Sequence, residues 1–569
     1  MGLMLEKAEI PFLILERTSA IRPTGGAISL CANVMRAMDQ LGLMDVLMKE
    51  SVPIQQIRYY DSMEGAVSVE KCDAVTDMLF CENRYGNAIR TIPRSVFINL
   101  LLARISQRKI LLGKRVIRTE ETTLESPLTP NASDSTGYVT CYCDDGSEYQ
   151  GSILVGADGT YSAVRKSMYQ NLYESGMLDG EETEKGGGMM TMDGKVMPHQ
   201  HCVVGVTQPL DPIEFKSLGG EYGEFQALRG DDDEHSIWLM PLTNFRIAWN
   251  VFFHFPEDIL QEYKDLQSSA TTVNNTDKST AEGSHFSFPG QYPSHLAGPK
   301  PQPQQQHNGA SWQSVSNRVH DRAEAALESL RDIPNPLSNR QGRFGDLLDK
   351  TDSDKISKVT LEQGVFRHWF HGRTALIGDA AHKSLPYAGQ GANQAILDSI
   401  ALVGKLYLLI KPAAIAGEVV PKMPRVAHRP MATRFCLTSR GPKANKSKHR
   451  LKSKPIRPSP IITTPLTTNT NWYTPQRSEL TKVFQEYYTE RSVMASQATW
   501  GASWADTIFG GQGLGASLAR FAFFKLLPMR LFYAMSDQYF EVQPVLPFLP
   551  DVADGWPGGA RRESEWRWT

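Results

Sequence analysis

The chain has 569 residues and a mass of 63.4 kDa, which exceeds one ordinary domain and predicts at least two cores, or one core with long insertions. Its 60 Lys and Arg residues against 62 Asp and Glu residues leave a net charge of −2, which argues against a protein that binds nucleic acid. Hydrophobic residues at 41% and charged residues at 21% exclude a wholly disordered chain.

The first part of the chain alternates helical and strand-like patterns. A helix is predicted from Gly2, followed by a short apolar strand over residues 11–15 that delivers the acid Glu16. Apolar residues at spacings of three and four then predict helices over residues 33–47 and 94–106. Charged side chains among the first ten positions interrupt any apolar run, so we expect no signal peptide.

Strands are predicted next, over residues 110–121, 138–145 and 152–156. Cys141 and Cys143 lie two apart in the second of these, which indicates packing on one face of a strand rather than a metal site. The seven cysteines of the chain are odd in number and scattered, which is typical of a reducing compartment. We therefore expect an intracellular, cytoplasmic protein without a metal site.

The stretch ILVGADGTYSAVRK, residues 153–166, joins a strand to a helix through a tight turn. Asp158 and Gly159 lie in the turn, and Ser162 is placed to cap the helix that follows. From the residues alone, this is a strand, a turn and a capped helix.

The central part is rich in strands. SIWLMPL and FRIAWNVFF are expected to form a hairpin that turns at Thr243 and Asn244. His199 and His201 are the polar groups available on a neighbouring strand, and each is more simply interpreted as a sheet histidine than as a base. Residues 261–313, rich in Ser, Thr, Asn, Gln, Gly and Pro, lack apolar periodicity and are predicted to be a disordered insertion.

The most informative stretch is GRTALIGDAAHKSLPYAGQGANQAILDSIALV, residues 372–403. A buried strand ends at Gly378 and Asp379, and Gly389 and Gly391 let the backbone approach a ligand closely. The helix that follows directs free N–H groups back at this turn, which favours an anionic oxygen, while the acid can bind a ribose or ribityl hydroxyl. The length of the motif favours this interpretation over a plain loop.

Two further segments stand out near the C-terminus. Residues 419–478 contain no Asp or Glu and many Lys and Arg, which predicts a second disordered insertion or a mistranslated gene segment rather than a nucleic-acid site. Residues 516–535 are apolar but interrupted by three cations. They are predicted to form an amphipathic helix that covers a core edge or touches a membrane surface, and not a transmembrane helix.

Strand and helix alternate at both ends of the chain around a strand-rich centre. This order predicts an α/β fold, mixed with α+β features: a Rossmann-like nucleotide-binding domain, interrupted by a β-sheet substrate domain and followed by a helical C-terminal region.

Two motifs resemble those of a known family. GADGTYSAVR and GDAAHKSLPYAGQGANQAILD resemble the internal signatures of FAD-dependent monooxygenases of the aromatic-hydroxylase type, in the order and spacing of that family. ENRYGNAIRTIPRSVFINLLLARI and KISKVTLEQGVF resemble its fungal branch, which hydroxylates or epoxidises meroterpenoid and indole-diterpene intermediates. The resemblance covers residues 2–410, apart from the first insertion, and resumes weakly from residue 480.

The resemblance implies a set of FAD-binding residues. Glu16 would bind the adenosine ribose, Arg94 the pyrophosphate and Asp379 the ribityl or pyrophosphate region, whereas from the residues alone Glu16 and Arg94 would be exposed surface groups. The remaining implied contacts come from the turns around the flavin and the nicotinamide, namely Gly26, Ser29, Asp158, Gly159, Pro386, Gly389, Gly391 and Ala392.

The resemblance also implies a reaction. NAD(P)H would reduce FAD, the reduced flavin would capture O₂ as a C4a-hydroperoxide, and one oxygen atom would pass to a hydrophobic prenylated, terpenoid or aromatic substrate. No catalytic side chain is assigned. A halogenase or dehydrogenase on the same fold is an alternative, although a Trp-x-Trp-x-x-Ile stretch typical of halogenases is missing from the sequence.

One departure from the family pattern bears on activity. The first strand and the GxGxxG turn that should precede the first helix are not found, so we expect an N-terminally truncated FAD-binding domain. The alternative function is then a non-catalytic remnant that cannot hold FAD, and a form extended upstream would bind it.

The expected domain limits follow from these assignments. They are residues 1–170 and 371–418 for the two parts of the FAD-binding domain, 171–260 and 314–370 for the substrate domain, 261–313 and 419–478 for the insertions, and 479–569 for the helical region.

Overall fold

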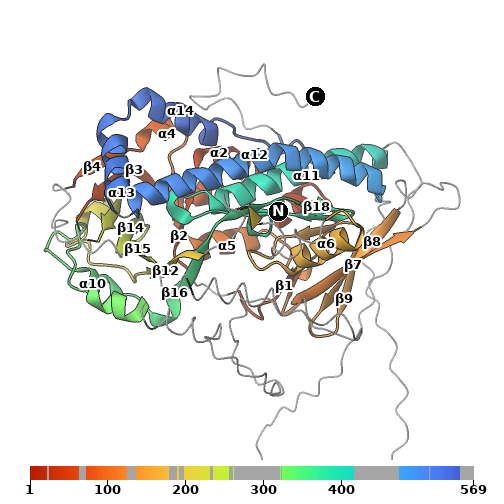
Figure 1. The fold of residues 1–569 in the computed structure, drawn as a ribbon, viewed down its shortest axis with the longest axis horizontal. Helices are drawn as coiled ribbons and strands as arrows, with labels where there is room; N and C mark the ends of the chain where they lie inside the picture. The colour runs from red at the N-terminus through yellow and green to blue at the C-terminus, as the bar shows by residue number, and fades with distance from the viewer. Residues whose placement is uncertain are drawn as a thin grey trace, which may run out of the picture.

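The computed structural model combines long helices with several sheets (Figure 1). It describes residues 1–21, 25–62, 72–124, 136–178, 189–190, 198–230, 235–254, 261, 321, 323–415, 473–511 and 513–550. Nearly all of both predicted insertions, 261–313 and 419–478, lies outside the described residues.

A parallel sheet typical of nucleotide-binding folds is present in two pieces. In one piece β1 (Ile14–Glu16) pairs with β6 (Ile110–Leu112). In the other, β10 (Leu154–Gly156) pairs in parallel with β19 (Thr374–Leu376), and β18 (Phe370–His371) completes that sheet. Among the described residues no strand joins β1 to β10.

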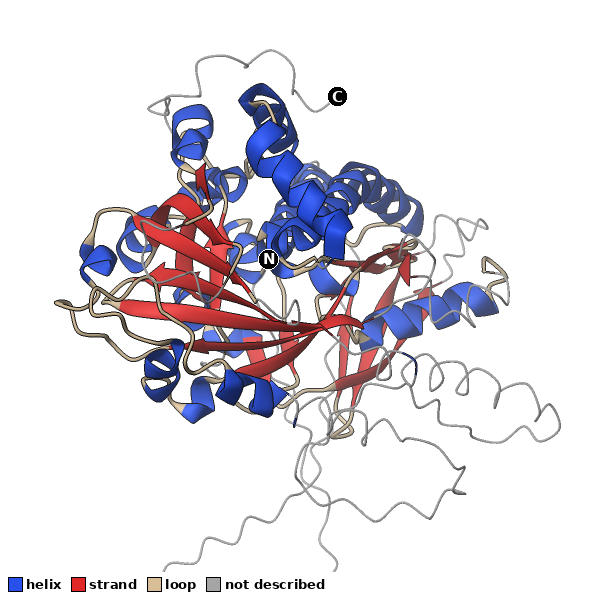
Figure 2. Ribbon diagram, turned by 60° about the vertical axis from the view of Figure 1, so that its left-hand side comes forward, coloured by secondary structure: helices blue, strands red, loops and turns tan. Residues whose placement is uncertain are grey.

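The largest sheet is a nine-stranded mixed sheet, which joins strands of the predicted substrate domain to strands from the first part of the chain (Figure 2). Its order is β16 (Ser357–Glu362), β12 (Pro198–Val206), β15 (Arg246–His254), β14 (His235–Leu242), β13 (Gly223–Arg229), β3 (Val52–Tyr60), β5 (Arg90–Pro93) and β2 (Ala27–Leu30), with β4 (Ala74–Asp77) against β3. The hairpin of β14 and β15 is confirmed, but its turn is one residue longer than predicted: Asn244 and Phe245 both adopt positive φ, and Leu242 pairs with Arg246. Because β2 and β5 come from the first part of the chain, this sheet connects the two predicted domains.

Two small sheets complete the strands. They are β7 (Val116–Leu124), β8 (Thr136–Cys143) and β9 (Glu148–Gly151), and β11 (Met189–Met190), β17 (Gly364–Phe366) and β20 (His382–Lys383). Cys141 and Cys143 are buried in β8 without a disulfide, which confirms their packing role. Among the described residues no group of His, Cys, Asp and Glu is arranged to hold a metal ion.

The helices cover the sheets from several sides. They are α1 (Gly2–Lys7), α2 (Ala32–Gln40), α3 (Met44–Glu50), α4 (Leu79–Tyr85), α5 (Arg94–Leu102), α6 (Ala163–Glu174), α10 (Phe344–Asp349), α11 (Gly391–Ile415), α12 (Arg477–Phe509), α13 (Gly513–Phe521) and α14 (Met529–Phe540). Short 3₁₀ turns lie at η7 (Gly378–Ala380) and η8 (Pro386–Ala388).

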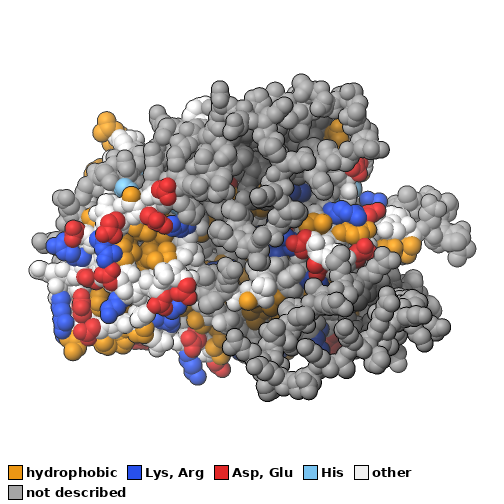
Figure 3. Space-filling view, turned by 90° about the horizontal axis from the view of Figure 1, so that it is seen from below, with side chains coloured by type: hydrophobic (Ala, Val, Ile, Leu, Met, Phe, Trp, Pro, Cys, Tyr) orange, Lys and Arg blue, Asp and Glu red, His pale blue; other side chains and the backbone are white. Residues whose placement is uncertain are grey.

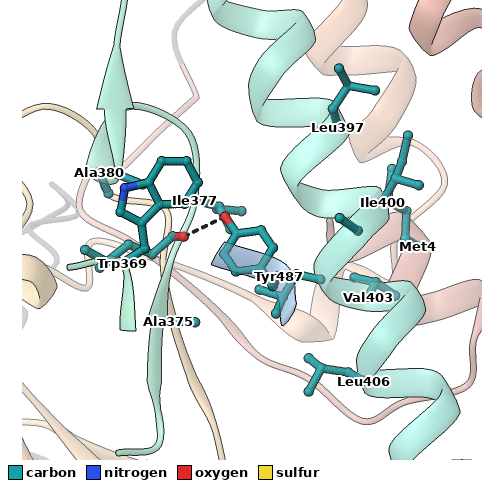
Figure 4. Close-up of a cluster of buried hydrophobic side chains, with 14 of the residues drawn as sticks. Met4, Trp369, Ala375, Ile377, Ala380, Leu397, Ile400, Val403, Leu406 and Tyr487 are labelled. Carbon is teal, nitrogen blue, oxygen red and sulfur yellow. Dashed lines mark hydrogen bonds between the residues drawn. The ribbon is translucent and has the colours of Figure 1, made fainter. Parts of the chain in front are cut away.

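The largest core lies where α11 meets the sheet of β18 and β19. Helices α11 and α12 run side by side, and Trp369 and Tyr487 are fully buried between them and the strands (Figures 1 and 4). The Tyr487 hydroxyl donates a hydrogen bond to the Leu376 carbonyl at 2.9 Å. The stretch Gly391–Lys411 is long and apolar enough to span a membrane, but 67% of it is buried within the protein, as in a core helix.

Three predicted elements are wrong in their extent. The helix expected over residues 33–47 is two helices, α2 and α3, because Gly42 adopts φ 70° after the first. The strand expected over residues 110–121 is likewise divided at Gly113, which has φ 69°. The amphipathic segment 516–535 is α13, a π-helical turn (Ala522–Leu526) and α14, with Pro528 ahead of the last helix.

The surface carries both signs of charge. In the view of Figure 3, cationic and anionic side chains alternate over the described part of that face. This mixture agrees with the net charge of −2.

Candidate functional site

The two glycine–aspartate turns meet at one edge of the parallel sheet. Gly156 of β10 is the register partner of Leu376 in β19, and the Ile377 N–H donates to the Gly156 carbonyl at 3.0 Å. Because the strands are parallel neighbours, the turns that carry Asp158 and Asp379 both follow the carboxyl ends of their strands. The two turns therefore lie close together at the same end of the sheet.

Arg165 on α6 connects the two turns directly. Its guanidinium donates to the Ala380 carbonyl at 3.0 Å and to the Thr160 carbonyl at 2.5 Å. The side chain is buried, and burial lowers the pKa of Arg165 to about 10. Sequence reasoning missed this role, although Arg165 lies within the motif that follows Asp158.

The Asp158 carboxylate is engaged by its own helix. It accepts hydrogen bonds from the Ser162 hydroxyl at 2.5 Å, from the Ala163 N–H at 2.8 Å and from the Val164 N–H at 3.2 Å. Ser162 in turn accepts from the Arg165 N–H at 2.8 Å, so the predicted cap of α6 is confirmed. The Asp158 carboxylate therefore stabilises its own turn. The neighbouring Gly159 has φ 79°, and a Cβ added to it would meet no atom within 4 Å.

The Asp379 side chain, unlike that of Asp158, is exposed and is not bound by its own turn. None of the described residues hydrogen-bonds its carboxylate. Gly378 before it adopts φ 57°, a left-handed conformation in which glycine is favoured. This conformation presents Asp379 outward at the sheet edge, where a ligand hydroxyl can reach it.

A buried ionic cluster holds the Asp379 turn from behind. Asp398 on α11 is fully buried, and it accepts hydrogen bonds from His382 Nε2 at 2.6 Å, from the Gly378 N–H at 2.8 Å and from Arg491 Nε at 2.9 Å. Burial alone would raise the pKa of Asp398, but the charges of His382 and Arg491, with the hydrogen bonds, lower that pKa to about 2. Sequence reasoning missed this cluster, although an acid within an apolar helix was a signal.

The glycine-rich turn approaches the β2 strand closely. Gly389 has φ 62°, and a Cβ on it would lie 3.6 Å from Ser29 Cβ. The Asn393 amide donates to the carbonyls of Ser29 and Gly389, both at 2.8 Å, and accepts from the Cys31 N–H at 3.0 Å. Asn393 therefore fixes the turn against β2, and it is a second residue that sequence reasoning missed.

Helix α11 opens at this turn. A Cβ on Gly391 would meet nothing within 4 Å, and Ala392 follows it at the helix start. The first N–H groups of a helix have no partner within the helix, so they offer donors to an anion. Pro386 begins the preceding turn η8, whose Tyr387 hydroxyl donates to Gln200 Oε1 at 2.5 Å and so connects the turn to β12.

The loop before β2 adds the next predicted residues. The Arg94 N–H donates to the Gly26 carbonyl at 3.1 Å, and a Cβ on Gly25 would lie 3.2 Å from Arg94 Cδ. The Arg94 side chain is exposed at the start of α5. Gly26, Ser29 and Arg94 thus lie on the same side of the molecule as the glycine-rich turn.

Glu16 belongs to the other piece of the parallel sheet. Its carboxylate accepts from the Thr18 N–H at 2.8 Å and from the Thr18 hydroxyl at 3.0 Å. It ends β1, as predicted, but no described hydrogen bond or strand pairing connects it to the turns of Asp158 and Asp379. Its contact with the adenosine ribose stays a prediction.

The two histidines considered as bases are placed differently. His201 is 2% exposed and, by strand alternation, lies on the face of β12 opposite to Cys202, which packs near Tyr387. The His199 side chain lies outside the described residues. His201 is therefore a sheet histidine, and no catalytic base is assigned.

Comparison with known proteins agrees with this geometry. A family model described as "FAD binding domain" matches residues 313–417, which include the Asp379 turn and α11. The chain is 25% identical over 414 residues to the FAD-dependent monooxygenase olcE of Penicillium canescens, covering 72% of this chain and 69% of that protein. It is 24% identical over 417 residues to ptmM of Penicillium ochrochloron, also an FAD-dependent monooxygenase, covering 72% and 75%.

A solved structure shares the fold. The structure of Klebsiella pneumoniae HpxO with FAD and uric acid superposes with a TM-score of 0.55 at 16% identity, over 95% of this chain and 94% of that chain. Together with the matching motifs, these findings place the chain in the class of FAD-dependent monooxygenases. FAD is its cofactor, and both of the sequence relatives named above are fungal enzymes of that class.

The residues present fit FAD. The open space over Gly159 and Gly391, the free first-turn N–H groups of α11 and the exposed Asp379 carboxylate suit a ligand with phosphates and polyol hydroxyls. Asp379, Gly391 and Ala392 would hold the ribityl chain and flavin, while Gly26, Ser29 and Arg94 would flank it. These individual contacts stay predictions.

Proposed function

We propose that the protein uses NAD(P)H and O₂ to hydroxylate or epoxidise a hydrophobic small molecule. The observation that carries the proposal is the position of the FAD-binding turns against an apolar sheet face. Tyr387 in η8 contacts Trp238 with ring centroids 5.1 Å apart, and it contacts Phe252 at 5.0 Å. A substrate bound beside these aromatic side chains would lie next to the flavin.

Each group of residues has a part in this reaction. FAD, when bound, supplies electron transfer from NAD(P)H and the activation of O₂. The α11 N-terminus and the Asp379 turn would bind and orient the cofactor, while the aromatic side chains of the sheet would exclude water from the reacting groups. Tyr387 has its pKa raised well above the ordinary value by burial, so it stays protonated and acts by positioning rather than as a base.

The experiment is to load the purified chain with FAD and follow oxidation of NADH and of NADPH together with O₂ consumption. We expect one of the two nucleotides to reduce the bound flavin and the reduced flavin to consume O₂, releasing hydrogen peroxide when no substrate is present. A loaded flavin that neither nucleotide reduces would contradict the proposal.

A second candidate is a fold without turnover that holds FAD weakly. The divided parallel sheet favours it, because β1 and β10 each have an edge that no described strand covers. The same experiment separates the two candidates, because a fold without turnover would retain little FAD after reconstitution.

We also propose a peripheral contact with a membrane through the C-terminal helices. The inner side of this region covers a core edge, because Phe524 stacks on Tyr59 at 5.2 Å and Asp537 binds Arg84. The outer side is apolar, with Leu514 85%, Leu518 69% and Leu526 64% exposed. Lys525 and Arg530 lie within the same segment, which suits an anionic lipid surface.

Flotation with vesicles of phosphatidylcholine and phosphatidylserine tests this contact. We expect the protein to float with the vesicles, and the combined change Leu514→Ser, Leu518→Ser and Leu526→Ser to reduce the bound fraction by about tenfold or more, because these are the three most exposed leucines of the segment. Equal flotation of both proteins, or none for the wild type, would contradict the contact.

A further inference from the structure

A row of side chains crosses the sheet face that lies toward the FAD-binding turns. Asn250 of β15 is the register partner of Val204 in β12 and of Trp238 in β14, and Trp238 is the partner of Ala227 in β13. Directly opposed residues of antiparallel strands point to the same face with Cβ atoms about 4.5–5.5 Å apart. Trp238 and Asn250 are therefore adjacent on one face.

Both side chains hold a buried polar atom without a partner among the described residues. These atoms are the Trp238 indole nitrogen and the Asn250 carboxamide oxygen. Trp238 is only 7% exposed, and a buried indole N–H ordinarily finds an acceptor. The missing partner points to a ligand, because a buried unpaired group destabilises the protein that carries it.

The second tryptophan of this sheet lies on the opposite face and provides a contrast for the indole, although Gln226 on that face also holds unpaired buried amide atoms. Trp249 lies one residue before Asn250 and is fully buried, and its indole N–H donates to the Thr351 hydroxyl at 2.9 Å. An unpaired indole is thus not a general feature of this sheet. It occurs on the face that lies toward the FAD-binding turns.

The row of Val204, Asn250, Trp238 and Ala227 is in contact with residues assigned to the FAD site. A Cβ on Gly26 would lie 3.3 Å from the Asn250 carboxamide oxygen and 3.4 Å from Val204 Cβ. On the other side, the Trp238 ring contacts Tyr387 of the turn η8 at 5.1 Å. The Trp238 and Asn250 pair therefore lies between the two loops that approach the flavin.

The surroundings of the pair are apolar. Trp238 makes edge contacts with Phe225 at 5.1 Å and with Phe252 at 5.0 Å. The next register pair on the same face, toward the hairpin turn, is Met240 with Ala248. A ligand at this place would find the Trp238 donor and the Asn250 acceptor in a mainly hydrophobic environment, with the Ser236 hydroxyl two residues away on the same face of β14.

We propose that Trp238 and Asn250 bind a hydroxyl group of the substrate. A hydroxyl can accept a hydrogen bond from the indole N–H and donate one to the carboxamide oxygen, so it satisfies both atoms at once. The substrate class is then a hydrophobic phenol or alcohol, rather than a hydrocarbon or an ether. This assignment rests on the proposed function and specifies the substrate of that same site.

The test compares para-pentylphenol with para-pentylanisole as probes. In the anisole a methyl group replaces the hydroxyl hydrogen, so its oxygen can accept a hydrogen bond but not donate one. Binding of each is measured by titration calorimetry on the FAD-loaded wild type, Trp238→Phe and Asn250→Leu, without NAD(P)H. We expect the wild type to bind the phenol about tenfold more tightly than the anisole. Asn250→Leu should weaken phenol binding by about three- to tenfold and leave anisole binding within about twofold, while Trp238→Phe removes the donor and should weaken both probes.

Unfolding of the ligand-free proteins gives an independent readout, with Trp249→Phe as the matched control. Trp238→Phe should cost less stability than Trp249→Phe, because the first removes an unpaired N–H and the second breaks a hydrogen bond.

A wild type that binds both probes equally, or neither, would overturn the proposal. It would also be overturned if Asn250→Leu weakened both probes equally. Failure of this proposal would be seen in the binding titrations. Failure of the proposed function would be seen separately, as a bound flavin that NAD(P)H does not reduce in the absence of any probe.

Discussion

Asp398→Asn is expected to lower the free energy of unfolding by about 3–5 kcal/mol, because it leaves a buried guanidinium without its counter-ion. Arg491 is 2% exposed and Asp398 is fully buried, so water cannot replace the lost partner. The variant also weakens the anchor of the Gly378 N–H, and thereby loosens the turn that presents Asp379. Urea unfolding of the two proteins measures the difference.

The control is Asp349→Asn, which breaks an exposed ion pair with Arg331 and should cost less than about 1 kcal/mol. Acid unfolding adds a second readout. Asp398 has a pKa of about 2 in the folded protein, and an unfolded Asp titrates at about 3.9, so its stabilisation is complete above about pH 4 and is lost as the pH falls toward 2. An Asp398→Asn variant as stable as the wild type would contradict the role of the cluster.

Asp379→Ala is expected to weaken FAD binding by about tenfold to a hundredfold, since a hydrogen bond to a charged group contributes about 1.5–3 kcal/mol. The FAD-free protein should keep its stability within about 0.5 kcal/mol, because the side chain is exposed and no described residue bonds to it. Flavin fluorescence titration gives the affinity, and urea unfolding gives the stability.

Asp349→Ala is the matched control for this second change, since it removes an exposed carboxylate on α10. Its FAD affinity should equal that of the wild type. If Asp379→Ala bound FAD as tightly as Asp349→Ala, the assignment of Asp379 to the cofactor would be wrong.

Local patterns predicted much of the fold. The hairpin of β14 and β15, the Ser162 cap of α6 and the long helix after the Asp379 turn depend on neighbouring residues, and each is present. The register of the hairpin was not predicted, because a turn of only Thr243 and Asn244 would pair Trp238 with Trp249. The turn also includes Phe245, so Trp238 pairs with Asn250 instead.

Long-range contacts could not be predicted in the same way. Arg491 meets Asp398 across 93 residues, and Asn393 meets Ser29 across 364 residues. Nothing in the sequence around either partner specifies the other, because these pairings depend on how α11 packs against α12 and β2. The breaks at Gly42 and Gly113 were missed for a different reason, since an apolar pattern that continues past a glycine conceals its positive φ.

The central claim is that the turns of Asp158 and Asp379 form one FAD site. Hydrogen–deuterium exchange of the purified chain, with and without FAD, tests it most directly. We predict that FAD slows exchange of backbone N–H groups in both residues 156–166 and residues 378–394. Protection of only one of these segments, or of neither at saturating FAD, would contradict the account.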